Sequence, residues 1–261
     1  MPGKRLALLA LAGSMAASAL AADIKVLTAG AFKPVVVALA PEFERKSGHR
    51  LVIDNDTAGA LARRIGGGEQ FDLVVLTEGA IGQLGRDGKL AAGAAAVLGR
   101  VGIGVAVKRG AALPDIGSVA AFERALLGAR AVAYIDPAAG GSSGVYLAQL
   151  FDKMGIAAQI KAKAVLVPGG LVAQRVVSGE ADIAVHQISE ILAVPDAVLV
   201  GPIPAEIQNY TVYAGGVSAG ARDPAAAKAL LAALRGEAAR TAMKARGMEA
   251  AEPVAAPAVR Q

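Results

Sequence analysis

The feature that most constrains the fold of this sequence is a repeated alternation of short β-prone runs with segments of helical periodicity. In the first half, the nearly all-apolar runs 24–28, 49–54 and 71–76 are each followed by a helical pattern. Strands that are apolar on both faces are typical of a parallel sheet covered by helices on both sides. Because the alternation restarts over 131–200, the sequence predicts two α/β units.

Two further β-prone runs, 101–108 and 209–217, join these units as long connecting strands and indicate two lobes. The expected organisation has four parts: a signal peptide at 1–21, a discontinuous first lobe at 22–100 and 205–250, a second lobe at 101–204, and a flexible tail at 251–261. Ligands of such sheets bind beyond the carboxyl ends of the strands. The expected site therefore lies in the cleft between the two lobes.

The segment 1–21 has the organisation of a secretory signal peptide. It begins with Lys4 and Arg5, continues as an apolar run, and ends in the small-x-small pattern Ala-Leu-Ala. The apolar run is shorter than the ~20 residues that a membrane-spanning helix needs. We therefore expect cleavage after Ala21 or Ala22 and export of the mature chain to the periplasm.

The composition excludes several classes of chemistry. The chain has no cysteine, so disulfides and thiolate catalysis are excluded, and with only two histidines it offers no Cys/His cluster for a structural metal. A formal net charge of +5 without a Lys/Arg cluster gives no indication of a nucleic-acid partner. The pair Gly102 and Gly104 lacks the third glycine of a dinucleotide fingerprint. We expect a monomer that needs no cofactor.

The stretch 134–151 predicts a strand, a glycine-rich turn at Gly140 and Gly141, and a helix that opens on Ser142 and Ser143. The first N–H groups of a helix have no intrahelical acceptor, and the macrodipole makes that end slightly positive. This turn therefore has the chemistry of an anion cradle, although an ordinary capped turn has the same pattern.

The turns after the other predicted strands share small residues, hydroxyl groups and exposed backbone amides. Several helix N-termini that converge on a cleft bind an oxyanion with neutral donors. The candidate ligand-binding residues are Gly30, Ala31, Phe32, Thr57, Ala58, Thr77, Gly141, Ser142, Ser143, Gly169, Gly170 and His186.

The order of several segments resembles the periplasmic solute-binding proteins of ABC importers, and in particular their molybdate-binding branch. The segments that carry the resemblance are 43–48, 57–61, 71–75, 84–90 and 176–184 (VVSGEADIA). The resemblance implies the type 2 periplasmic-binding-protein fold, with two α/β lobes that close around a ligand. It also implies that the connecting strands 101–108 and 209–217 are the two crossing strands that form the hinge. It further implies two partners, a small anionic ligand and an ABC permease in the inner membrane.

The sequence departs from the molybdate pattern at the residues that bear on the ligand. Gly30 and Ala31 stand where the family usually has a serine after the first strand, and His186 and Gln187 stand where it usually has a tyrosine. Hydroxyls and amides also suit organic carboxylates. The ligand is thus either an oxyanion such as molybdate, bound without any protein metal site, or a small di- or tricarboxylate.

Two functions remain open at this stage. The leading hypothesis is a receptor without catalytic residues that delivers a small anion to the permease. The alternative is an isomerase of an unsaturated tricarboxylate that resembles trans-aconitate isomerase, with His186 or Lys33 as general acid or base. A histidine at this position is as often a buried structural group as a ligand contact.

Five other side chains carry expectations of their own. We expect His49, which precedes a strand, to lie at the surface. Arg63 and Arg175 lie in the helices that begin at the cleft, from which an arginine can reach a carboxylate, although most helix arginines are solvated. Tyr134 and Tyr146 are expected in the core.

Overall fold

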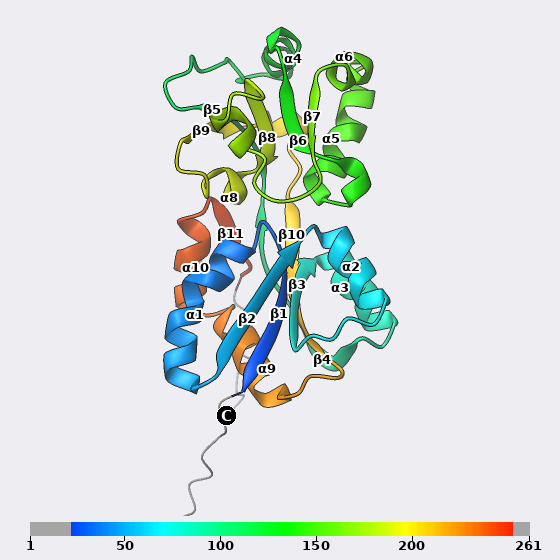
Figure 1. The fold of residues 1–261 in the computed structure, drawn as a ribbon, viewed down its shortest axis with the longest axis vertical. Helices are drawn as coiled ribbons and strands as arrows, with labels where there is room; N and C mark the ends of the chain where they lie inside the picture. Colours follow the sequence, from blue (N-terminus) through cyan, green and yellow to red (C-terminus); the bar gives the residue numbers. More distant parts are fainter. Residues whose placement is uncertain (1–21, 253–261) are drawn as a thin grey trace, which may run out of the picture.

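The structure is a computed structural model that describes residues 22–252, so the expected signal peptide and the end of the expected tail lie outside the described residues. The chain forms two lobes, one above the other in Figure 1, each built on a mixed sheet. The predicted α/β architecture with two lobes is confirmed.

The lower lobe in Figure 1 contains a six-stranded sheet in the order β11-β4-β10-β3-β1-β2. Its strands are β1 (Asp23–Ala29), β2 (Arg50–Asp56), β3 (Leu73–Thr77), β4 (Leu90–Val101), β10 (Thr211–Ser218) and β11 (Met248–Ala250). β1 runs parallel to β2 and β3, whereas β10 is antiparallel to β3 and β4. Its helices are α1 (Lys33–Ser47), α2 (Ala58–Gly66), α3 (Glu78–Arg86), α9 (Pro224–Ala233) and α10 (Glu237–Lys244).

The upper lobe contains a five-stranded sheet in the order β7-β6-β8-β5-β9. Its strands are β5 (Ile103–Lys108), β6 (Val132–Ile135), β7 (Ala164–Val167), β8 (Ile183–Gln187) and β9 (Ala197–Pro202). Its helices are α4 (Val119–Gly128), α5 (Ser142–Lys153), α6 (Ala157–Lys161), α7 (Gln174–Val177) and α8 (Ile188–Ile191). The central pairs β6–β7 and β6–β8 are parallel, and β5 is antiparallel to β8 and β9.

The predicted strand 101–108 is wrong in its extent, because two strands meet there. β4 ends at Val101 in the first sheet, and β5 begins at Ile103 in the second. β4 was not predicted, since seven of its twelve residues are alanine or glycine, which have little β propensity. The chain returns to the first sheet between β9 and β10. The predicted lobe boundaries, at 100/101 and 204/205, remain a prediction about which residues move together.

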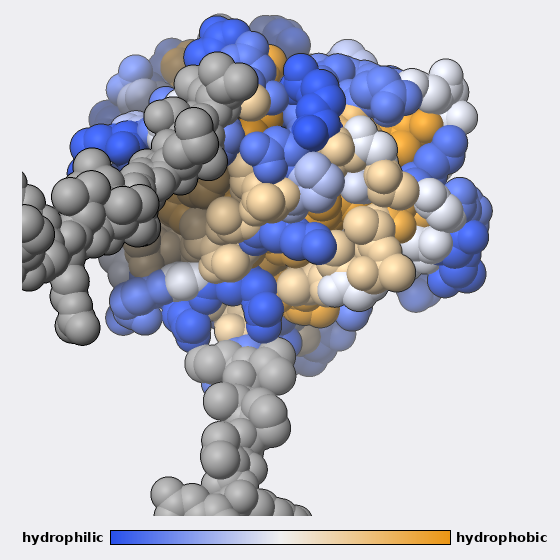
Figure 2. Space-filling view, turned by 90° about the horizontal axis from the view of Figure 1, so that it is seen from below, coloured by the Kyte–Doolittle hydropathy of each residue, from blue (hydrophilic) through white to orange (hydrophobic). Residues whose placement is uncertain are grey.

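The hydrophobic cores of the two lobes are filled mainly by aliphatic side chains, so the fold needs few aromatic residues. The first lobe has one continuous cluster of buried residues, in which Phe32 and Tyr213 are the largest fully buried side chains. The second lobe has two clusters, one on each face of its sheet. Figure 2 looks onto the end of the first lobe that is farthest from the second lobe, where hydrophilic and hydrophobic residues are mixed. The opposite end of this lobe carries the carboxyl ends of β1 and β2, and the site is formed there.

Candidate functional site

A polar cleft lies between the lobes, at the carboxyl ends of strands from both sheets. Nine of the twelve predicted ligand-binding residues line it. The complete lining consists of Ala29, Gly30, Ala31, Asn55, Asp56, Thr57, Ala58, Ile135, Gly141, Ser142, Ser143, Gly170, His186, Gln187, Glu190 and Tyr213. Most of the turns predicted from the sequence therefore lie at this cleft, whereas Asn55, Asp56, Glu190 and Tyr213 were not among the predicted site residues.

The two lobes touch directly at one side of this cleft. The hydroxyl of Thr57 donates a hydrogen bond of 2.6 Å to the carbonyl oxygen of Ala139 in the other lobe. The N–H of Gly59 donates to the carbonyl oxygen of Gly140 at 3.0 Å. A Cβ at Gly59 would lie 2.8 Å from that oxygen, so only glycine permits this approach. The lobes are therefore in a closed arrangement.

Little space remains inside the closed cleft. The cavity volume, measured as the space open to the centre of a water molecule, is about 30 Å³. By the same measure one water needs roughly 10–15 Å³, so the cleft has room for about two waters. A larger ligand enters only if the lobes separate or the lining side chains move.

The N-terminus of α5 points into the cleft, as the sequence predicts. The first intrahelical hydrogen bond runs from the N–H of Val145 to the carbonyl oxygen of Gly141. The N–H groups of Ser142, Ser143 and Gly144 precede that bond, so they have no acceptor within the helix. With the two serine hydroxyls beside them, they form a group of neutral donors at the positive end of the helix dipole.

Thr57 organises the opposite wall of the cleft. Its hydroxyl caps α2 by accepting a hydrogen bond from the N–H of Ala60 at 3.1 Å. Its own N–H donates to Asp56 Oδ1 at 2.7 Å, and Asp56 Oδ2 lies 3.7 Å from Arg64. The carboxylate of Asp56 is thus turned toward protein donors although the residue lines the cleft.

His186 and Glu190 form a buried pair at the base of the cleft. Nε2 of His186 lies 3.3 Å from Oε2 of Glu190. Burial lowers the pKa of His186 to about 3 and raises the pKa of Glu190 to about 8. Although the two groups are close enough for an ion pair, both are uncharged between these values. Nδ1 of His186 is buried and has no hydrogen-bond partner among residues 22–252.

Gly30 makes room for the carboxyl group of Glu190. A Cβ on Gly30 would lie 2.5 Å from Oε1 of Glu190, so any larger residue displaces the carboxyl. The hydroxyl of the neighbouring Ser189 donates to the carbonyl oxygen of Ala31 at 2.9 Å and holds α8 against the first lobe. The space that a serine would fill at this turn is therefore occupied by an acid from the other lobe.

Gln187 connects the cleft to the crossing strand β10. Its Nε2 lies 2.9 Å from the hydroxyl oxygen of Ser142, 3.1 Å from that of Thr211 and 2.8 Å from that of Tyr213. Burial, and secondarily the charge of Glu190, raises the pKa of Tyr213. A tyrosine hydroxyl is thus present in the cleft, but it comes from β10 and not from the second-lobe strand.

Three predicted residues and Lys33 do not line the cleft. Phe32 is fully buried, with its ring centroid 6.0 Å from that of Tyr213. Thr77 caps α3 and lines a neighbouring groove together with Ala58 and Ser142. Gly169 lies just outside, beside Asp56. The ammonium group of Lys33 donates to Oδ1 of Asn55 at 2.7 Å.

The prediction of a surface position for His49 is wrong. The side chain is buried because its Nδ1 accepts a hydrogen bond of 3.3 Å from the N–H of Ala22, and its Nε2 lies 3.9 Å from Asp223. A histidine flanked by arginine in the sequence gives no sign of this packing against the start of β1.

The arginines and tyrosines outside the lining have definite partners. Arg63 extends across the lobe contact, with Nη2 3.4 Å from the carbonyl oxygen of Ala139. Arg175 pairs with Glu180 at the surface. Tyr134 is buried as predicted, in an edge-to-face contact with Phe151. Tyr146 is half-buried, and its hydroxyl donates to the carbonyl oxygen of Ile207 at 2.7 Å.

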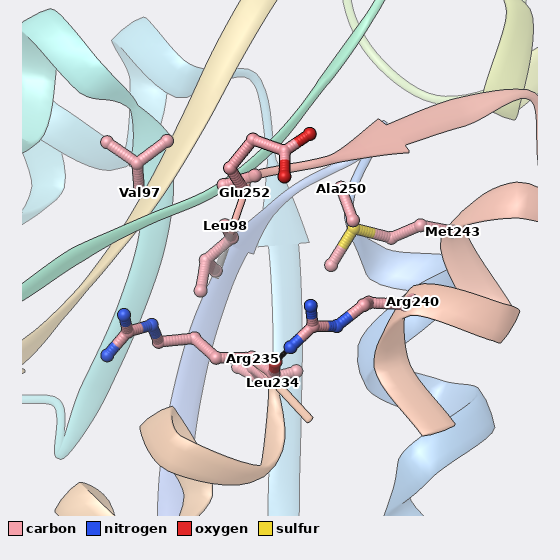
Figure 3. A pocket seen from close by; sticks show the side chains of 9 residues that line it. Val97, Leu98, Leu234, Arg235, Arg240, Met243, Ala250 and Glu252 are labelled. Atoms are coloured by element: carbon pink, nitrogen blue, oxygen red, sulfur yellow. Dashed lines mark hydrogen bonds between the residues drawn. The ribbon is translucent and has the colours of Figure 1, made fainter. Parts of the chain in front are cut away.

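A second hollow lies away from the cleft, between β4, β11 and the helices α9 and α10 (Figure 3). Arg240 reaches into it and donates a hydrogen bond of 3.0 Å to the carbonyl oxygen of Arg235. Leu98 and Met243 form apolar walls, and Glu252, the last described residue, lies at its edge. Nine of the twelve predicted ligand-binding residues line the cleft and none of them lines this hollow, so the cleft is the candidate site.

Two further observations apply to residues 22–252. None of the helices there combines the length and the apolar character required to cross a membrane. Within the same range, no three His, Cys, Asp or Glu side chains are grouped as a metal ion would need.

Comparison with known families agrees with this geometry. A family model described as bacterial extracellular solute-binding protein matches residues 24–249. The chain belongs to this family. A curated relative of this solute-binding protein is an aconitate isomerase from Pseudomonas sp, which is 35% identical over 232 residues, or 87% of each chain.

Solved structures of periplasmic binding proteins share the fold. The periplasmic molybdate-binding protein of Azotobacter vinelandii has a TM-score of 0.71 at 20% identity, over 88% of this chain and 99% of that one. The sulfate-binding protein of Mycobacterium tuberculosis has a TM-score of 0.71 at 16% identity, over 89% and 88%. The predicted two-lobed fold of periplasmic binding proteins, and the resemblance to them, are therefore confirmed.

Proposed function

We propose that this solute-binding protein is an isomerase of an unsaturated tricarboxylate and interconverts trans- and cis-aconitate. The observation that carries the proposal is the buried carboxyl group of Glu190 beside His186 at the base of the cleft. A pure receptor needs no group that holds a proton near neutral pH. The relative named aconitate isomerase supports the same chemistry.

The proposed reaction is a proton shift across an allylic system. Ionised Glu190 removes a proton from the methylene carbon, and the electron pair of the broken C–H bond spreads over the three-carbon unit and its carboxylates. The same carboxyl group, now protonated, returns the proton to the carbon that was vinylic. The double bond moves, and no oxidant or other reactant is consumed. A pKa of about 8 suits both steps because it lies near the working pH.

His186 serves as the neutral partner in this proposal. Because burial lowers its pKa to about 3, the imidazole does not take the proton from Glu190 near neutral pH. The proton therefore stays on the carboxyl group that faces the cleft. Of the two acid–base candidates in the sequence, His186 thus acts through Glu190, and Lys33 does not line the cleft.

Neutral donors bind the substrate carboxylates in this proposal. No lysine or arginine is found in the cleft lining within the described part of the chain. The N–H groups and hydroxyls of Ser142 and Ser143, at the positive end of α5, supply donors without a cation. The same donors stabilise the negative charge that develops when the proton leaves carbon.

In this proposal the lobes separate to admit the substrate, because the closed cleft has room for about two waters. The two connections at Gly102 and between β9 and β10 form the hinge of this proposed motion. Closure then brings Gly30 of the first lobe against Glu190 of the second and excludes water from the proton transfer.

The decisive experiment is to mix the purified mature protein with trans-aconitate and follow the cis isomer by proton NMR. We expect its signals to grow at a rate proportional to protein concentration until equilibrium is reached. A wild-type protein that produces no cis-aconitate at any pH from 5 to 9 would sink the isomerase proposal.

A second candidate function is supported by the family and the shared fold. We propose as the alternative a periplasmic, monomeric receptor that delivers a small anion to an ABC permease in the inner membrane. A thermal-shift panel of molybdate, sulfate, phosphate, citrate and both aconitates separates the two. A rise in Tm with molybdate or sulfate alone, without turnover of aconitate, favours the receptor.

A further inference from the structure

Lys33 and Asn55 form a contact at the rim of the cleft that fixes the direction of an amide group. Nζ of Lys33, the first residue of α1, lies 2.7 Å from Oδ1 of Asn55, near the end of β2. An ammonium group can only donate hydrogen bonds, so the oxygen of the amide must face Lys33. The two N–H donors of Asn55 Nδ2 therefore face away from Lys33, on a side chain that lines the cleft.

Within the described residues, the amide N–H groups of Asn55 have no protein acceptor and the ammonium group of Lys33 has no ion-pair partner. No protein group within residues 22–252 accepts a hydrogen bond from Nδ2 of Asn55, and no carboxylate lies within 4.0 Å of Lys33 Nζ. By contrast, Lys25 pairs with Glu69 and Lys46 pairs with Glu42. The neighbouring Asp56 carboxylate is occupied by the N–H of Thr57 and lies near Arg64.

We propose that Asn55 is a specificity-determining residue that donates to a carboxylate of the ligand, and that Lys33 is its positioning residue. Lys33 holds the amide in the donating orientation and places one positive charge near a cleft whose lining, within residues 22–252, contains no lysine or arginine. The ligand class rests on the proposed function, since a tricarboxylate has more negative charge than the α5 terminus alone can receive. Lys33 is thereby assigned to recognition and not to proton transfer.

Two substitutions test the pair in the full mature chain. Asn55→Asp replaces the N–H donors by a negative charge that still accepts from Lys33. With trans-aconitate as substrate, we expect KM to rise about 10- to 100-fold, the range for losing a hydrogen bond to a charged group, while kcat changes less than about 3-fold. Lys33→Met keeps the length of the stem and is expected to raise KM about 10-fold. Its KM should also depend less steeply on ionic strength, because a screened charge has been removed.

The matched control is Lys228→Met, which removes the same charge from an exposed position on α9, away from the cleft. It should leave KM and its salt dependence as in the wild type. If Asn55→Asp does not fold, as judged by circular dichroism, Asn55→Ser is used instead, because it removes the amide without introducing a charge. An effect of these variants on kcat with no change in KM overturns the proposal.

A binding arm separates this inference from the proposed isomerase activity. The Kd of trans-aconitate and citrate is measured by calorimetry for the wild type and the three variants. If the wild type binds them without turnover and Asn55→Asp weakens binding at least 10-fold, the isomerase proposal fails and the recognition pair stands. If the wild type turns over trans-aconitate and both Asn55→Asp and Lys33→Met match it in KM and Kd, the recognition pair is wrong. A wild type that binds neither anion also overturns it.

Discussion

Oε2 of Glu190 lies 3.3 Å from Nε2 of His186, and burial reverses the order of their acidities. In water a glutamic acid gives its proton to a histidine, since the ordinary pKa values are 4.5 and 6.5. Here the pKa of Glu190 is raised to about 8 and that of His186 is lowered to about 3. The proton therefore resides on the carboxyl group, which is the group that lies against Gly30 at the lobe contact.

The first prediction concerns Glu190→Gln, which keeps the size of the side chain but cannot take or return a proton. We expect the rate of cis-aconitate formation to fall about 10²- to 10⁴-fold, the usual contribution of a general acid or base. Binding should persist, so trans-aconitate should still raise Tm. The control Glu78→Gln changes an exposed carboxylate on α3 and should leave the rate unchanged. Full turnover by Glu190→Gln would assign the proton transfer to another group.

The second prediction is a pH dependence of stability. Because the folded state raises the pKa of Glu190 to about 8, the stability linked to its proton is complete below the unfolded value of 4.5 and is lost as the pH rises through 8. His186 behaves in the opposite way: its folded pKa of about 3 means that stability is complete above 6.5 and is lost as the pH falls toward 3.

Urea unfolding at pH 5, 7 and 9 measures this dependence. The free energy of unfolding of the wild type relative to Glu190→Gln should decrease from pH 5 to pH 9, because only the wild type must ionise a buried carboxyl. The two contributions oppose each other between about pH 4.5 and 6.5, so the wild type should change least there. A difference between the two proteins that is the same at all three pH values contradicts the raised pKa of Glu190.

The third prediction concerns Gly30→Ala. The added Cβ would lie 2.5 Å from Oε1 of Glu190, so the carboxyl group must move. We expect at least a 10-fold loss of kcat. The matched substitution Gly82→Ala introduces a Cβ on an exposed face of α3, where the nearest atom is at 3.6 Å, and should stabilise by about 0.5–1 kcal/mol without loss of turnover. Steady-state kinetics and urea unfolding distinguish the close approach at Gly30 from a general effect of replacing glycine.

The alternation of strands and helices sufficed to predict the fold, because apolar strands followed by amphipathic helices have few other ways to bury their faces. It failed at β4, whose alanines and glycines gain their strand conformation from pairing with β10. Such pairing joins residues that are far apart in the sequence, so it cannot be predicted from local β propensity.

The site was predictable as far as it consists of strand ends and helix starts. Ser142 and Ser143 were found because a cap and its helix are adjacent in the sequence. Glu190 was not singled out, although its spacing of four residues from His186 is visible, because nothing local shows that both are buried. Tyr213 was missed for a different reason. The family pattern places a tyrosine on a strand of the second lobe, whereas Tyr213 reaches the cleft from β10, a strand of the first lobe.

The fourth prediction concerns Gln187→Leu. Nε2 has two hydrogens and three hydroxyl oxygens within 3.1 Å, so the amide and the hydroxyls satisfy one another as a network. Leucine has a similar volume and leaves these hydroxyls without their partner. We expect a loss of about 1–3 kcal/mol in the free energy of unfolding. The exposed Gln83→Leu should change it by less than about 0.5 kcal/mol, and equal losses in the two variants would contradict a buried network.

The last prediction compares two threonines that cap helices of the first lobe. Thr57 caps α2 and also donates to the carbonyl oxygen of Ala139 in the second lobe, whereas Thr77 only caps α3. Thr57→Val and Thr77→Val each remove a cap, and each should lower the free energy of unfolding by about 1 kcal/mol.

Only Thr57→Val removes a hydrogen bond between the two lobes, which the protein makes when the lobes are closed. A ligand that binds the closed form must then supply the energy of that lost bond, so its Kd should rise roughly 5- to 10-fold, the equivalent of a net hydrogen bond of about 1 kcal/mol or slightly more. Calorimetric titration with trans-aconitate or citrate measures the change. If Thr77→Val weakens binding as much as Thr57→Val, the loss comes from the helix cap, and the Thr57–Ala139 contact does not contribute to closure.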